Sequence, residues 1–92
     1  MISRTTQPFR KLYADLPKTI RRHAKKAYSI FQNDPRHPSL HFKRVHSTLP
    51  IHAVRITKDY RAVGVQQDDE IVWFWIGKHA QYDKLLNRMR NA

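Results

Sequence analysis

The chain has 92 residues and a net charge of +11, because 18 Lys and Arg residues face only 7 Asp and Glu residues. This length predicts one domain, residues 1–92, with a single small core. The sequence contains no cysteine, which excludes disulfides and thiolate chemistry, and its apolar runs are too short to cross a bilayer. A domain this basic generally has a polyanionic partner, so the charge favours a nucleic acid or an acidic protein. We therefore expect a cytoplasmic protein that acts away from membranes.

Apolar residues at helical spacing predict two consecutive helices in the first third of the chain. One stripe lies within residues 9–16 and another within residues 20–31. Pro17 is expected at the first position of the second helix. This helix should end before Pro35, because a residue that precedes proline avoids helical angles. Residues 7–34 are therefore predicted to form a helical hairpin.

Beyond the hairpin the apolar period changes to two, which predicts β-strands. The last expected strand, IVWFWI, is apolar on both faces, as is typical of a central strand. In this strand Trp73 and Trp75 alternate, so we expect both on one face and within the core. The short turns between strands predict antiparallel pairing. The expected strands are residues 41–45, 51–56, 60–65 and 71–76.

Two segments complete the expected fold. A stripe from Tyr82 to Met89 predicts a closing helix over residues 79–90. Residues 1–6 are either a short edge strand or a loose arm. The predicted fold class is α+β: an N-terminal helical hairpin packed on an antiparallel sheet of about four strands, followed by a short C-terminal helix.

Three stretches resemble the RelE/ParE toxin superfamily, especially its plasmid-stabilisation or HigB-like members: NDPRHPSLHFKRV, VRI with DYRAVGV, and VWFWIGKHAQYDKLL. The resemblance as a whole covers roughly residues 8–86. The most specific parts are the Tyr60–Arg61 pair and the G-x-H-x-x-Y-D run from Gly77 to Asp83. The resemblance implies a helical hairpin on a curved sheet, with a basic cleft on the open face.

The same resemblance implies a toxin of a toxin–antitoxin pair. RelE-like members are endoribonucleases that cut mRNA, commonly on the ribosome, whereas ParE-like members share the fold but inhibit DNA gyrase. We predict an endoribonuclease that uses no metal and no other cofactor, with mRNA, the ribosome and an antitoxin as partners. The antitoxin is expected to be acidic and to fold into a helix on the basic face. The alternatives are a gyrase inhibitor, a module that only binds RNA or its antitoxin, and an inactive chromosomal copy.

RNA cleavage without a metal defines which side chains are needed. The 2'-hydroxyl attacks the adjacent phosphate, so a group must take its proton, a cation must stabilise the phosphorane, and the leaving 5'-oxygen must gain a proton. Arg61 matches the arginine that RelE-like toxins use to stabilise the phosphorane charge. The alternative is a structural arginine that pairs with an acid such as Asp59.

His79 is the second candidate, because it lies between the last strand and the last helix, beside Arg61. The preceding Gly77 is expected to supply backbone freedom for a tight turn. The helix N-terminus and Lys78 both disfavour the imidazolium, which suits a general base. The resemblance supports a catalytic role, and the alternative is a helix cap. Tyr82 is expected either to orient a base or bind phosphate, or to pack in the core.

Other basic residues extend the expected site. His52 lies on a strand where RelE-like nucleases often carry lysines, so it either replaces them as acid or base or lies on the surface. Arg55, on the same strand, matches an arginine of both nuclease and gyrase-type members. Like charges at i, i+4 on the second helix repel, which indicates a phosphate-binding face or, alternatively, a solvated one. The remaining expected phosphate-binding residues are Lys43, Arg44 and Lys78, and, on the second helix, Lys18, Arg21, Arg22, Lys25 and Lys26.

Three histidines close in sequence raise the question of a metal site. His37 and His41 flank a proline in a loop, and His46 follows. Neither a cysteine nor a pair of acids completes a ligand set. We therefore expect no metal.

Overall fold

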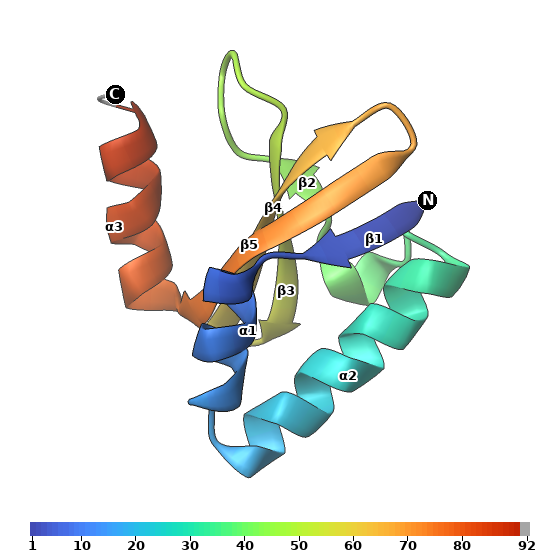
Figure 1. Cartoon of the computed structure of the whole chain (residues 1–92), viewed down its shortest axis with the longest axis vertical. Helices are drawn as coiled ribbons and strands as arrows, with labels where there is room; N and C mark the ends of the chain where they lie inside the picture. Colours follow the sequence, from blue (N-terminus) through green and yellow to red (C-terminus); the bar gives the residue numbers. More distant parts are fainter. Residues whose placement is uncertain (91–92) are drawn as a thin grey trace.

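The computed structural model describes residues 1–90. One sheet contains five strands in the order β1-β5-β4-β3-β2. Figure 1 shows α1 and α2 together at one side of this sheet and α3 apart from them. Within the described residues no helix is both long and apolar enough to span a membrane. The elements are β1 (Ile2–Thr5), α1 (Gln7–Ala14), α2 (Lys18–Asn33), a short 3-10 turn (Pro38–Leu40), β2 (Lys43–Arg44), β3 (Ile51–Thr57), β4 (Tyr60–Gln67), β5 (Glu70–Lys78) and α3 (His79–Arg90).

The α+β class and the helical hairpin are confirmed, but the sheet has five strands instead of about four. The additional strand is β1, which runs parallel to β5 at the edge of the sheet. The Nε1–H of Trp73 donates a hydrogen bond of 2.8 Å to the Oγ of Ser3. An ion pair of 2.7 Å joins Arg4 to Glu70. The first residues therefore form an edge strand, and it is held by side-chain contacts that no local sequence pattern reports.

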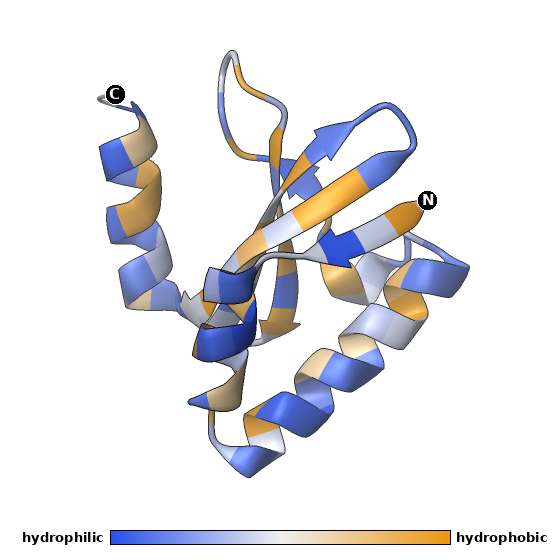
Figure 2. Ribbon diagram, viewed as in Figure 1, coloured by the Kyte–Doolittle hydropathy of each residue, from blue (hydrophilic) through white to orange (hydrophobic). Residues whose placement is uncertain are grey.

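The helical hairpin forms as its end signals indicate. The Oγ1 of Thr6 accepts a hydrogen bond of 3.2 Å from the backbone N–H of Phe9, which caps α1. Pro17 precedes α2 as its N-cap and is not its first helical residue. The guanidinium of Arg21 donates to the carbonyl of Ala14 at 3.0 Å, which ties α2 to the end of α1. Figure 2 shows hydrophobic and hydrophilic residues alternating along α2, as expected of a helix with one buried face.

The sheet divides the hydrophobic core into two clusters, one on each face, and the inner strand β5, between β1 and β4, contributes to both. We call the face that carries Val54 and Trp73 the hairpin face, because it packs against the buried side of α2. We call the opposite face, which carries Val63 and Trp75, the α3 face, because it packs against α3. A strand buried on both sides is expected to be apolar, as β5 is over residues 71–76.

The two tryptophans of β5 lie on opposite faces, so the expectation that they share one face was wrong. Val63 pairs with Trp75, but its neighbour Gly64 pairs with Trp73, and the register shifts between these pairs. Phe74 is the extra residue of this β-bulge. The bulge reverses the alternation, so that each face of the sheet receives one indole.

Two glycines provide space for these indoles. A Cβ atom on Gly64 would lie 2.8 Å from Cε3 of Trp73, and one on Gly77 would lie 2.8 Å from Cζ2 of Trp75. No glycine of the described chain has a positive φ, and β5 continues through Gly77 to Lys78. The expected role of Gly77 in a tight turn was therefore wrong, because the position needs a small residue and not unusual backbone angles.

Replacement of Ser3 by Ala tests whether the Trp73 contact holds β1 on the sheet. The buried indole N–H would lose its acceptor, so we expect the free energy of unfolding to fall by about 1–3 kcal/mol in urea denaturation. Ser29→Ala is the matched control, because Ser29 is exposed on α2 and alanine favours a helix. Equal stability of the two variants would contradict this role of the hydrogen bond.

Candidate functional site

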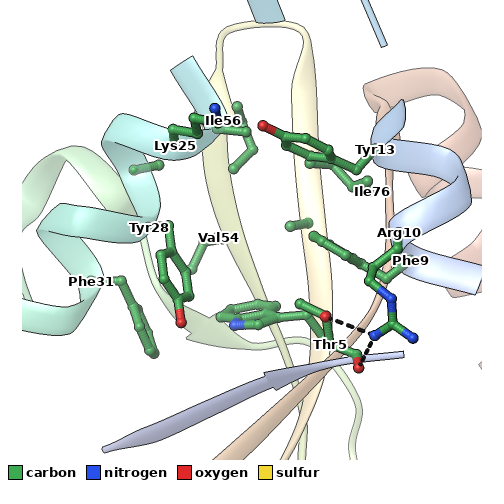
Figure 3. Close-up of a pocket in the computed structure, with 14 residues that line it drawn as sticks. Thr5, Phe9, Arg10, Tyr13, Lys25, Tyr28, Phe31, Val54, Ile56 and Ile76 are labelled. Atoms are coloured by element: carbon green, nitrogen blue, oxygen red, sulfur yellow. Dashed lines mark hydrogen bonds between the residues drawn. The ribbon is translucent and has the colours of Figure 1, made fainter. Parts of the chain in front are cut away.

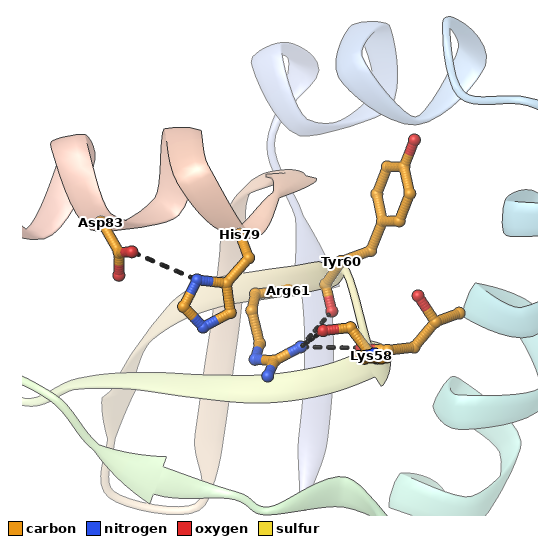
Figure 4. A network of polar contacts seen from close by, with 6 residues as sticks. Lys58, Tyr60, Arg61, His79 and Asp83 are labelled. Atoms are coloured by element: carbon orange, nitrogen blue, oxygen red, sulfur yellow. Dashed lines mark hydrogen bonds and ion pairs between the residues drawn. The ribbon is translucent and has the colours of Figure 1, made fainter.

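Arg61 lies on the α3 face of β4, beside the turn that joins β3 to β4. Its Nη1 donates to the carbonyl oxygens of Thr57 at 2.7 Å, Tyr60 at 3.0 Å and Lys58 at 3.3 Å. Within residues 1–90, no ion pair joins Arg61 to a carboxylate, so the alternative pairing with Asp59 does not form. Figure 4 shows the guanidinium held by this turn through one nitrogen. The other N–H groups of this half-buried guanidinium have no hydrogen-bond acceptor within the described residues.

Arg55 lies directly opposite Arg61 in the β3–β4 pairing. Burial, and then the charge of Arg55, lower the pKa of the Arg61 guanidinium, although an arginine stays charged in a protein. Lys43 on β2 lies opposite Ala53, whose side chain packs on the α3 face. The register therefore places Arg55, Arg61 and Lys43 on the same face. Like charges directly opposite each other in a sheet are unfavourable, which suits a surface that binds an anion.

His79 is the first residue of α3, and the end of β5 brings it beside Arg61. Gly77 pairs with Arg61 across the sheet, and the backbone N–H of His79 donates to the carbonyl of Asp59 at 2.7 Å. The imidazole Nδ1 lies 3.2 Å from an oxygen of Asp83, four residues later on the helix. Figure 4 shows the ring between this carboxylate and the Arg61 guanidinium. Asp83 has no role among the residues expected from the sequence, although its i, i+4 spacing from His79 is a signal for this contact.

The ring of Tyr82 is part of the hydrophobic core on the α3 face. Only 6% of the residue is exposed, and its ring packs at 6.4 Å from that of Trp75 and edge-on at 5.5 Å from that of His79. Burial raises the pKa of the Tyr82 hydroxyl, and the charge of Arg61 opposes this effect. The hydroxyl therefore stays neutral near pH 7, as a hydrogen-bond donor near Arg61.

His52 is not brought to this site. It lies on the hairpin face, where its ring stacks on Phe42 at 5.0 Å with an interplanar angle of 23°. Its Nδ1 is 3.2 Å from the carbonyl oxygen of Pro50. Arg55, three residues later, lies on the other face of the sheet. The structure therefore places His52 and Arg61 on opposite faces of the sheet, which favours the alternative that His52 takes no part in the site.

Two further expected phosphate-binding residues lie elsewhere. Lys78 pairs with Tyr60, which puts it one residue out of phase with Gly77 and Arg61, and hence on the hairpin face. Arg44 holds the loop between β2 and β3. It donates to the carbonyl oxygens of Thr48 at 2.8 Å, His46 at 3.1 Å and Leu49 at 3.3 Å.

The basic residues of α2 also lie on the hairpin side, so the expected cations form two separate surfaces. A largely apolar groove of about 520 Å3 lies between α1, α2 and the sheet. Figure 3 shows Phe9 and Tyr13 on one wall and Tyr28 and Phe31 on the other. Two cations, Arg10 and Lys25, border the groove. The α2 residues are Lys18, Arg21, Arg22, Lys25 and Lys26, and all but the half-buried Arg21 are exposed.

The loop histidines His37, His41 and His46 are not grouped into a metal site, and two of them accept hydrogen bonds from nearby backbone N–H groups. The Nδ1 of His46 accepts from the backbone N–H of Leu49 at 3.0 Å, and its Nε2 lies 3.3 Å from the carbonyl oxygen of Met89 in α3. The Nδ1 of His37 accepts from the backbone N–H of Ser39 at 3.2 Å. In the described part of the chain, no three side chains of His, Asp or Glu are grouped to hold a metal ion.

A family model described as a ParE-like toxin domain matches residues 18–84. Among curated proteins, none matches the chain significantly.

Solved structures share the fold at low sequence identity. A chain of the RelB–RelE antitoxin–toxin complex from Methanococcus jannaschii superposes with a TM-score of 0.73 at 17% identity, covering 89% of this chain and 96% of that one. YafQ from E. coli gives a TM-score of 0.70 at 13% identity, covering 87% and 94%. The isolated E. coli RelE toxin gives 0.64 at 17% identity, covering 96% and 97%.

Replacement of Arg55 by Gln is expected to stabilise the fold, because it removes the charge opposite Arg61. The free energy of unfolding should rise by about 0.2–1 kcal/mol, and high salt should reduce the gain by screening the repulsion. Thermal unfolding at two salt concentrations measures both effects. The matched control is Arg36→Gln, in an exposed loop, and an equal gain there would show that the effect is one of net charge alone.

Proposed function

Since the chain belongs to the family of ParE-like toxin domains, we propose that it is the toxin of a toxin–antitoxin pair. As a toxin it would act in the cytoplasm and cut mRNA on the ribosome. The observation that carries the nuclease proposal is the grouping of a cationic fork and an imidazole at one end of the sheet. Arg61 is held by the β3–β4 turn, and His79 is hydrogen-bonded to the same turn through its backbone.

The proposed reaction needs no group beyond the RNA, these side chains and water. The 2'-oxygen forms a bond to the adjacent phosphorus while the bond from phosphorus to the 5'-oxygen breaks, which leaves a cyclic phosphate and a 5'-hydroxyl. His79 takes the proton of the 2'-hydroxyl, and water supplies a proton to the 5'-oxygen. Arg61 stabilises the additional charge on the phosphorane through hydrogen bonds that strengthen as the charge develops.

Neighbouring side chains support binding. Arg55 lies opposite Arg61, and Lys43 shares their face, so the RNA backbone would run across β2, β3 and β4. The neutral hydroxyl of Tyr82 is a donor for a phosphate oxygen or a base. Each cation that contacts a phosphate contributes a part of the affinity that falls as salt rises.

A gyrase inhibitor remains the second candidate, because specific observations favour it. The matching family model is of the ParE-like type, and β3 offers no lysine on the α3 face. In that case the same basic face would bind a protein and would need no proton acceptor. The two functions therefore differ in what His79 does.

The antitoxin has a structurally suitable site in the apolar groove between α1, α2 and the sheet. Its aromatic walls fit the apolar side of an amphipathic helix, and Arg10, Lys25 and the exposed cations of α2 favour acidic residues on the flanks of that helix. The chain's net charge of +11 favours the same partner at long range. We propose that a helix of the antitoxin occupies this groove.

Cleavage of mRNA by the purified chain tests the nuclease proposal. The assay compares naked mRNA with mRNA on a programmed ribosome and maps the new ends. We expect Arg61→Ala to lower the rate by about 100- to 1,000-fold, because a donor to the developing charge is lost. We expect His79→Ala to lower it by at least about 100-fold, because a proton transfer is lost.

Two exposed residues provide the controls for this assay. Arg36→Ala and His23→Ala remove the same residue types, in a loop and on the hairpin side, and both should cut at the normal rate. Absence of cutting by the folded unmodified chain on either substrate would reject the nuclease. Inhibition of DNA gyrase by that same sample would then establish the second candidate.

Replacement of Tyr28 by Glu tests the groove. Tyr28 is 40% exposed on one wall, so a carboxylate there should remove an apolar contact and repel an acidic helix. We expect the Kd for the cognate antitoxin, which should be encoded by a small acidic reading frame next to the gene, to rise about 30-fold or more, measured by calorimetry. Leu49→Glu is the matched control, because Leu49 is 51% exposed outside the groove. Equal affinities of the two variants would place the antitoxin elsewhere.

A further inference from the structure

Asp83 gives His79 an acidic partner that the proposed chemistry has not used. The carboxylate lies 3.2 Å from Nδ1, and both side chains reach solvent, with exposed fractions of 45% for His79 and 59% for Asp83. We propose that Asp83 is a positioning residue, which holds a proton on Nδ1 of His79 and so leaves Nε2 as the nitrogen that accepts a proton from RNA. This inference rests on the nuclease proposed above.

The hydrogen bond fixes which nitrogen of the neutral ring carries the proton. An ionised carboxylate only accepts hydrogen bonds, so the nitrogen that faces Asp83 must be the donor. The neutral imidazole then has its lone pair on Nε2, which is the form that a base requires. Figure 4 shows Nδ1 pointing toward Asp83, and the opposite edge of the ring on the side where the Arg61 guanidinium lies.

The ring is held by more than this one contact. Its edge-on packing against Tyr82 brings the two ring centres to 5.5 Å, and the backbone N–H of His79 is anchored on Asp59. Arg61 pairs with Gly77, two residues before His79. The orientation of Nε2 relative to Arg61 is therefore set by the sheet, by α3 and by the carboxylate together.

The proton can be followed through the step. As the 2'-oxygen bonds to phosphorus, its proton moves to Nε2, and the ring becomes an imidazolium with both nitrogens protonated. The Nδ1–H stays on the ring, and the Asp83 carboxylate faces the positive charge that the ring has gained. Asp83 neither touches the RNA nor takes a proton itself.

A passive role for Asp83 predicts a different result. A carboxylate beside Arg61 and Arg55 repels RNA, and an exposed ion pair contributes little to folding stability. If Asp83 only decorated a binding surface, its neutralisation would strengthen RNA binding and leave the chemical step unchanged. If Asp83 positions His79, its neutralisation would strengthen or preserve binding and slow the chemical step.

The first test is a kinetic comparison of Asp83→Asn with the unmodified chain on ribosome-bound mRNA. We expect kcat to fall by at least about tenfold while KM stays equal or falls, because a mispositioned base loses part of its contribution. The matched control is Asp68→Asn, which removes the same charge at an exposed turn. Its asparagine also tolerates the positive φ of 55° at that position. An unchanged kcat with a lower KM in Asp83→Asn would overturn the inference.

The second test does not depend on activity. Nitrogen-15 NMR of the full chain, at a pH where the imidazole is neutral, reports which ring nitrogen of His79 carries the proton. The signals are assigned by their loss in His79→Gln. We expect protonated Nδ1 in the unmodified chain and a shift of the proton toward Nε2 in Asp83→Ala. Protonated Nε2 in the unmodified chain, or no change in Asp83→Ala, would overturn the positioning role.

The two tests separate the inference from the function on which it rests. If the unmodified chain cuts RNA but the NMR signals show protonated Nε2, the nuclease stands and the role of Asp83 falls. If the unmodified chain cuts no RNA, the nuclease falls, and with it the proton transfer assigned to Nε2.

Discussion

The β-bulge at Phe74 is the constraint on which the rest of the molecule depends. It lets β5 present Trp73 to the hairpin face and Trp75 to the α3 face. Without it, strict alternation would place both indoles on one face of the sheet. The α3 face would then lose the ring against which Tyr82 packs. Because α3 carries His79 on its first turn, the position of the imidazole follows from how the core fills two faces of one strand.

The facing positive charges of Arg61 and Arg55 make the site basic and reduce the stability of the fold. Arg61 and Arg55 face each other on neighbouring strands, and burial adds to the penalty at Arg61. A sheet selected only for stability would place opposite charges at such a pair. The carbonyl oxygens of the β3–β4 turn partly offset the cost by holding one nitrogen of Arg61. The unfavourable pair is thus retained at the place where an anion would relieve it, as is typical of functional sites.

Apolar spacing and turn residues predicted correctly those helices and strands that depend on local sequence. The closing helix over residues 79–90 and the strand pair that begins with Tyr60 follow from spacing and turns alone, and both are observed. β1 stayed ambiguous because its partner lies at the other end of the chain. The prediction that Trp73 and Trp75 share one face was wrong because the β-bulge depends on how β5 pairs with the neighbouring strand. The separation of His52 from Arg55 was already implied by strand alternation, since an odd number of positions divides them.

The groove and the candidate active site lie on opposite faces of the sheet, which constrains how one antitoxin could act on both. Ile56 lines the groove, and the next two residues, Thr57 and Lys58, supply carbonyl oxygens that hold Arg61. The groove and the site therefore meet at the same end of the sheet, around the β3–β4 turn. An extended chain advances about 3.3 Å per residue, so a short segment beyond a groove-bound helix spans this turn. Binding in the groove would raise the local concentration of that segment over Arg61 and His79, which links the affinity of the antitoxin on one face to inhibition on the other.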